Sequence, residues 1–74
     1  MSSAVCRVLD VRDLEPPEPM ERVLDALPEL VAGERLCMIH RREPYPLYPI
    51  LRRDGYRYET SLTPDGDYQI LIWR

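Results

Sequence analysis

The chain has 74 residues, of which 45% are hydrophobic and 31% are charged, and its net charge is -3 at pH 7. This length allows one domain with a small core, and the hydrophobic content excludes a disordered chain. The acidic balance argues against general nucleic-acid binding, although all 10 basic residues are arginines, which suit carboxylate or phosphate recognition. No apolar run is long enough to cross a membrane and no signal peptide is visible, so we expect a cytoplasmic protein.

The first predicted element is a strand over Val5–Val11, where β-branched residues are prominent. Because side chains alternate along a strand, Leu9 should face one side of the sheet and Val8 the other. Cys6 should share the side of Val8 as a half-buried strand residue without a reactive role. Residues 1–4 precede this strand and are expected to form a disordered start.

Prolines on both sides of Glu18 open the first predicted helix, which runs from about Pro17 to Leu27 and should be ended by Pro28. Proline fixes φ near the helical value and lacks only an N–H that the first turn leaves unpaired anyway. Glu18 adds a carboxylate near the positive end of the helix dipole. Four apolar residues at helical spacing predict the buried stripe: Met20, Val23, Leu24 and Leu27.

A second strand is predicted over Glu34–Arg41, with a continuous apolar run that favours a central position covered on both faces. Cys37 lies within this run and is expected to be an inert packing residue. His40, the only histidine, stands at the carboxyl end of the strand, which is where α/β sheets bind their ligands. A lone histidine is more often a structural residue than a ligand-binding one, so both interpretations stay open.

Three prolines open the second predicted helix, which runs from the first of them, Pro44, through about Asp54. Its buried stripe is Leu47, Ile50 and Leu51. Strict alternation of polar and apolar residues over 56–62 predicts a strand with one wet face. Thr63–Asp67 has proline and glycine where a hairpin turn needs them, and Tyr68–Trp73 is the last predicted strand.

The segment before the first helix contains a spaced motif and a proline cluster: Leu9, Asp10, Arg12 and Leu14, then Pro16-Pro17-Glu18-Pro19. It resembles the start of the TusA/SirA-like sulfur-carrier superfamily, whose members show Leu-Asp-x-Arg-x-Leu, one further residue and Cys-Pro-x-Pro. In that superfamily the cysteine carries a persulfide, and here Pro16 holds its position. Because proline can neither ionise nor be sulfurated, the resemblance implies the fold but not the carrier activity.

The chain more closely resembles an uncharacterised, domain-of-unknown-function branch of the same superfamily, along its whole length. The further segments that carry this resemblance are His40–Tyr48 and the terminal Ile70–Trp73. The resemblance implies a small bacterial domain that is found in redox, nitrogen-oxide or sulfur-related contexts. Such an association does not define a mechanism.

The predicted order of elements is strand, helix, strand, helix, strand, strand. The first two strands are joined by a helix and should be parallel with a right-handed crossover, whereas the last two form an antiparallel hairpin. The resemblance implies a single α/β (α+β) domain over residues 1–74, a two-layer sandwich with sheet order 1-2-4-3. Both helices should cover one face of the sheet.

Since the two helices cover one face only, apolar strand residues on the other face should form a patch of the kind that marks an interface. The residues expected there are Val8, Cys37, Ile39, Leu71 and Trp73. We therefore expect this open face to dock a partner protein or a second copy of the chain.

The loops after the first two strands should lie side by side, because both follow the carboxyl ends of parallel strands. Candidate ligand-binding residues in and beside these loops are Arg12, Glu18, His40, Arg41, Arg42 and Tyr45. Arginines and a helix N-terminus favour a small anionic ligand, although arginines at such positions are more often solvated surface charge. The predicted function is a non-catalytic binding or regulatory module.

No catalytic residue, cofactor or metal site is predicted, since His40, the methionines and the cysteines show no recognisable ligand spacing. The alternative function is sulfur transfer through Cys6 or Cys37, although neither cysteine is predicted at a helix N-terminus or beside a base. Nucleic-acid binding through Tyr56, Tyr58 and nearby arginines is a weaker alternative, because the net charge is acidic.

Overall fold

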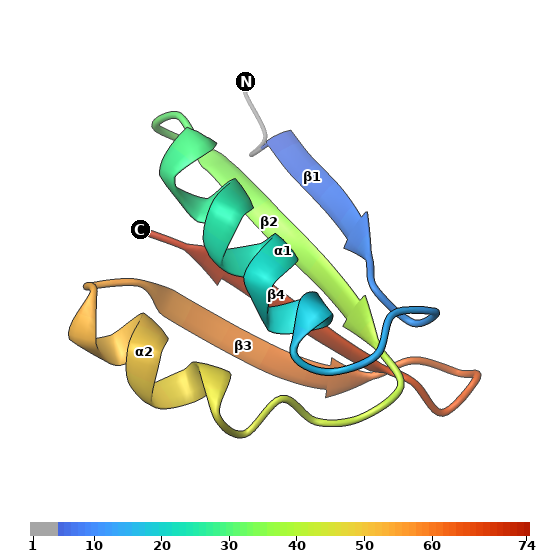
Figure 1. Cartoon of the computed structure of the whole chain (residues 1–74). Helices are drawn as coiled ribbons and strands as arrows, with labels where there is room; N and C mark the ends of the chain where they lie inside the picture. Colours follow the sequence, from blue (N-terminus) through green and yellow to red (C-terminus); the bar gives the residue numbers. More distant parts are fainter. Residues whose placement is uncertain (1–4) are drawn as a thin grey trace.

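A four-stranded mixed sheet forms one layer of the computed structural model, and two helices pack against one face of the sheet as the second layer (Figure 1). The structure describes residues 5–74, so the expected disordered start over residues 1–4 lies outside the described residues. The elements are, in chain order, β1 (Val5–Asp10), α1 (Glu18–Ala26), a 3₁₀ turn (Leu27–Glu29), β2 (Glu34–His40), α2 (Leu47–Arg53), β3 (Arg57–Leu62) and β4 (Tyr68–Trp73).

Strand pairing follows the order β1-β2-β4-β3 and confirms the predicted fold class and strand order. β1 and β2 are parallel, as the strand–helix–strand connection predicted, and β4 runs antiparallel to both β2 and β3. In the β3–β4 turn, the Thr63 N–H donates a hydrogen bond of 2.8 Å to the Asp67 carbonyl oxygen. Gly66 has a φ of 88° in this turn, a value that favours glycine.

The core lies between the sheet and the two helices. In its centre, Leu36 and Met38 of β2 pair with Ile72 and Ile70 of β4, and all four side chains are fully buried. The helical segments contribute buried residues from the apolar stripes that their spacing predicted: Val23, Leu27, Leu47 and Leu51. Removal of this apolar surface from water stabilises the packing of both helices on the same face.

Both helices are shorter than the sequence predicted, and prolines explain the difference. α1 ends at Ala26 rather than Leu27, because Pro28 cannot donate a backbone hydrogen bond and the chain tightens into the 3₁₀ turn. α2 begins only at Leu47, whose N–H closes a preceding turn through a hydrogen bond of 2.9 Å to the Pro44 carbonyl oxygen. No helix within the described residues has the length and apolarity needed to span a membrane.

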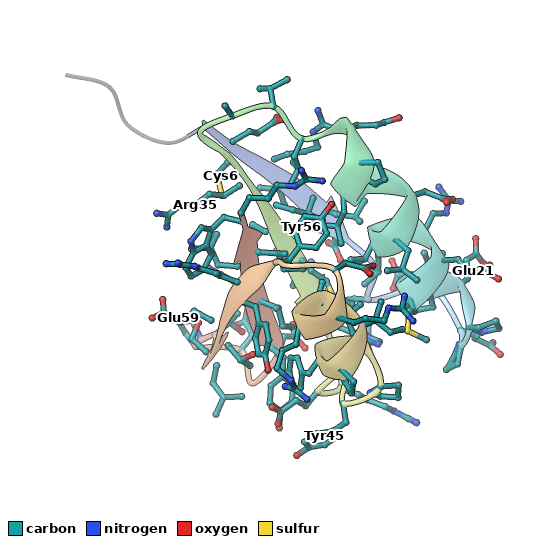
Figure 2. The ribbon with its side chains drawn as sticks, turned by 90° about the vertical axis from the view of Figure 1, so that its left-hand side faces the viewer. Cys6, Glu21, Arg35, Tyr45, Tyr56 and Glu59 are labelled. Atoms are coloured by element: carbon teal, nitrogen blue, oxygen red, sulfur yellow. The ribbon has the colours of Figure 1, made fainter. Side chains whose placement is uncertain are left out.

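The face of the sheet away from the helices is uncovered, and Figure 2 shows Cys6, Arg35 and Glu59 on this side. Cys6 is exposed rather than half-buried as predicted, because it lies on an edge strand of the uncovered face. Strand register and side-chain alternation place all the predicted patch residues on this open face: Val8, Cys37, Ile39, Leu71 and Trp73. Val8 is 61% exposed, whereas apolar residues that belong to a core are buried.

Candidate functional site

A pocket of about 250 Å³ opens between the loop that leads into α1 and the loop that leads into α2. These loops leave the carboxyl ends of the parallel strands β1 and β2 at the same edge of the sheet (Figure 1). Five prolines line the pocket: Pro16, Pro17, Pro19, Pro44 and Pro46. We refer to this site as the proline-walled pocket. Its position agrees with the prediction that the two loops lie side by side.

Apolar side chains from three elements complete the walls of the proline-walled pocket. Met20 comes from the first turn of α1, Met38 from the centre of β2 and Leu47 from the start of α2. Met38 and Leu47 are fully buried, so their positions are fixed by core packing. Because proline also fixes the backbone φ, the pocket is pre-formed and a ligand need not order its walls.

His40 is one of three polar residues that line the pocket, with Arg42 and Glu43. The backbone N–H of Arg41 donates a hydrogen bond of 2.9 Å to Nδ1 of His40, which leaves the Nε2–H of the neutral ring as its donor. Burial lowers the pKa of His40, and the positive charge of Arg42 lowers it further. Both effects on this pKa favour the uncharged ring of His40, in which Nε2 carries the proton.

The Glu43 carboxylate is held by Tyr48. The hydroxyl of Tyr48 lies 2.9 Å from a carboxylate oxygen of Glu43, to which it donates, and 2.8 Å from the hydroxyl oxygen of Thr60 on β3. The ring of Tyr48 stacks on that of Tyr58, with 4.6 Å between their centroids. Burial is the main cause of the raised pKa of Tyr48, so this hydroxyl stays protonated. These contacts fix the pocket loop between β2 and α2 against β3.

Arg12, a predicted ligand-binding residue, is instead bound to two carboxylates. Its guanidinium lies 2.7 Å from a carboxylate oxygen of Asp10 and 3.1 Å from one of Asp67. The side-chain hydrogen bond from Arg12 is the largest cause that lowers the pKa of Asp10 to about 2. Arg12 thus ties the loop after β1 to the β3–β4 turn, and its charge is already compensated.

The other predicted residues divide between the pocket and the surface around it. Glu18 pairs with Arg22 at 3.2 Å on α1, and the guanidinium of Arg41 lies 3.4 Å from a carboxylate oxygen of Asp13. Tyr45 is 67% exposed and projects from the loop ahead of α2 (Figure 2). Of the six predicted ligand-binding residues, the pocket contains only two: His40 and Arg42.

Sequence reasoning missed the pocket's apolar walls. Met20 and Leu47 were assigned to apolar helix stripes, and Met38 lies within the apolar run of the second predicted strand, so all three were interpreted only as packing residues. The signal that could have found the site is the pair of proline clusters, one after each parallel strand. Prolines in both loops form rigid walls of a pocket. A buried core requires only apolar residues at regular spacing, so proline clusters in loops point to a site rather than to a core.

Cys6 and Cys37 lie on the open face, which is the opposite side of the sheet from the helices. Cys37 is buried, and burial is the main cause that raises its pKa, with a smaller contribution from Cys6. A raised pKa reduces the thiolate fraction, which is the nucleophilic form. The surroundings of Cys37 therefore do not activate it for sulfur transfer.

The chain matches the model of one protein family. That model, DUF2249, is described as an uncharacterized conserved protein and matches residues 8–74. No match was found among curated proteins or among solved structures. The matched region contains both pocket loops and all residues of the proline-walled pocket.

Proposed function

The chain belongs to the DUF2249 family, and we propose that it is a non-catalytic module that binds a small molecule in the proline-walled pocket. The observation that carries this proposal is the pocket itself, a pre-formed apolar space with a few polar groups at its rim. Small-molecule sites in proteins have this composition, and they occur at the carboxyl ends of parallel strands.

We also propose that the chain shares ancestry with the TusA/SirA-like carriers and retains their site without their chemistry. Pro16, which stands where the carriers have their cysteine, lines the pocket. The strand order 1-2-4-3 is the one that this resemblance implies. Such a module would bind a ligand in a redox or sulfur-related regulatory context, but would form no persulfide at this position.

The proposed binding site is tested by a substitution that fills the pocket with a larger side chain. Phenylalanine in place of the pocket residue Pro46 should occupy the space that a ligand needs, and the expected result is at least about tenfold weaker binding. Binding of benzyl alcohol, benzamide and benzoate is followed by NMR through the ring signals of His40, the only histidine. In the unmodified chain at least one of these probes should shift the His40 signals to saturation.

The matched control is Pro49→Phe, which places the same side chain at an exposed position of α2 outside the pocket. It should leave binding unchanged. The proposal fails if none of the probes gives a saturable shift, or if both variants weaken binding equally.

A second proposal concerns the open face, which we infer to dock a partner protein that presents an apolar strip flanked by carboxylates. Trp73 lies between two arginines: Arg57 is its cross-strand neighbour, and the guanidinium of Arg35 lies 4.8 Å from its ring centroid. Within residues 5–74, neither arginine has a carboxylate partner. The apolar patch would contact the apolar strip of the partner, and the positive charges of Arg35 and Arg57 would attract its carboxylates.

Trp73 is the only tryptophan, so its fluorescence reports directly on the open face. We expect a synthetic amphipathic helix of leucine and glutamate to shift the Trp73 emission to shorter wavelength, because the indole would leave water. Arg57→Glu should abolish the shift, whereas Arg53→Glu on α2 should not. Absence of a shift would overturn the proposal, and a concentration-dependent shift without peptide would instead assign the face to a second copy of the chain.

A further inference from the structure

We propose that the proline-walled pocket selects a small monocarboxylic acid with a compact apolar body. The inference rests on the proposed binding function and names the class of its ligand. It follows from three features of the pocket: its size and apolar walls, the uncompensated charge of Arg42, and the fixed donor of His40.

The size of the pocket limits the ligand to a single ring or a short branched chain. A volume of 250 Å³ has room for one ring with a small substituent, since an apolar cavity of about 150 Å³ already holds benzene. Met20, Met38 and Leu47 offer such a body only apolar contacts. Inorganic phosphate has no apolar body to place against these walls, so it gains none of the free energy that comes from burying apolar surface there.

Arg42 supplies the positive charge that a carboxylate requires. Three other arginines of these loops and of α1 have carboxylate partners, namely Arg12, Arg22 and Arg41. Arg42 has none within residues 5–74, although it lines the pocket. A guanidinium binds a carboxylate through two parallel hydrogen bonds, which makes Arg42 the natural anchor for the acid group.

His40 and Glu43 restrict the ligand to one negative charge. His40 presents Nε2–H as a neutral donor, because its Nδ1 already accepts from the Arg41 N–H. It can therefore add a hydrogen bond to the ligand without adding a second positive charge. Glu43 lines the same pocket, and the negative charge of its carboxylate disfavours a second negative group on the ligand, so a monoanion fits better than a dianion.

The experiment compares benzoate with benzamide, which has the same ring but no charge, and with inorganic phosphate. We expect benzoate to bind about tenfold more tightly than benzamide, the usual order for a charge-assisted hydrogen bond. Arg42→Gln should remove that difference, while Arg42→Lys should retain part of it. The control is Arg41→Gln, at the neighbouring arginine outside the pocket, which should leave the preference for benzoate unchanged.

The outcomes separate this inference from the proposed function. The proposed ligand class is wrong if benzamide binds as tightly as benzoate, or if Arg42→Gln leaves the ratio of their dissociation constants unchanged. In both cases the pocket still binds small molecules. Phosphate that displaces benzoate from the pocket at equal concentration would also contradict the class. If no probe binds, both the inference and the proposed function fall. Arg42 is exposed, so its variants should fold, which their NMR spectra would show directly.

Discussion

Replacement of Leu36 by alanine should lower the free energy of unfolding by about 2–5 kcal/mol. Leu36 is fully buried on β2 and pairs with Ile72 in the centre of the sheet, where the helices cover it. A domain of 74 residues has a total stability of only about 4–11 kcal/mol, at about 0.05–0.15 kcal/mol per residue. The variant should therefore unfold at a much lower urea concentration than the unmodified chain.

The control for this prediction is the same substitution at Leu62, which is 65% exposed on β3. Leu62→Ala should change the free energy of unfolding by no more than about 0.5 kcal/mol. Urea denaturation followed by circular dichroism measures both variants. Equal losses at Leu36 and Leu62 would contradict the placement of the core between the sheet and the helices.

Replacement of Tyr48 by alanine has the second largest expected effect, a loss of about 2–3 kcal/mol, somewhat below that of a fully buried aromatic residue. The variant loses the stack on Tyr58 and the hydroxyl contacts with Glu43 and Thr60. The substitution should also release the loop between β2 and α2. The ring of His40 should then lose its hydrogen bond from the Arg41 N–H and become mobile. Urea denaturation and the line widths of the His40 NMR signals measure the two effects.

Tyr48→Phe separates the ring of Tyr48 from its hydroxyl. It keeps the stack on Tyr58 and should cost about 1 kcal/mol, the usual value of a side-chain hydrogen bond. If Tyr48→Phe proved as damaging as Tyr48→Ala, the hydroxyl would be the main support of the loop. If neither variant changed stability or the His40 signals, the loop would not depend on Tyr48.

The fold could be predicted because local patterns and connectivity point to the same structure. Helical spacing identified Val23 and Leu27 as buried, and alternation placed Ile70 and Ile72 on one face of the last strand. The helical connection between the first two strands predicted their parallel pairing. The helix ends could not be predicted to the residue, since Pro28 is compatible with a last helical turn or with the 3₁₀ turn that contains it, Leu27–Glu29.

The candidate site could be predicted only in part, because side-chain pairing depends on contacts between distant residues. Arg12 and Arg42 looked equivalent in the sequence, as both follow a predicted strand. Only the fold brings Asp67 within 3.1 Å of Arg12, across 55 positions of the chain, and so compensates one arginine but not the other. His40 was recognised by its position at a strand end, but its fixed Nδ1 contact required the backbone geometry.

A crystal structure of the chain with benzoate tests the central claim most directly. We expect the ring to lie among Pro17, Met20 and Leu47, with the carboxylate within hydrogen-bond distance, about 2.7–3.2 Å, of the guanidinium of Arg42. Benzoate bound on the open face beside Trp73, with the proline-walled pocket empty, would contradict the account. Benzoate in the pocket with its carboxylate turned away from Arg42 would retain the binding site and reject the proposed ligand class.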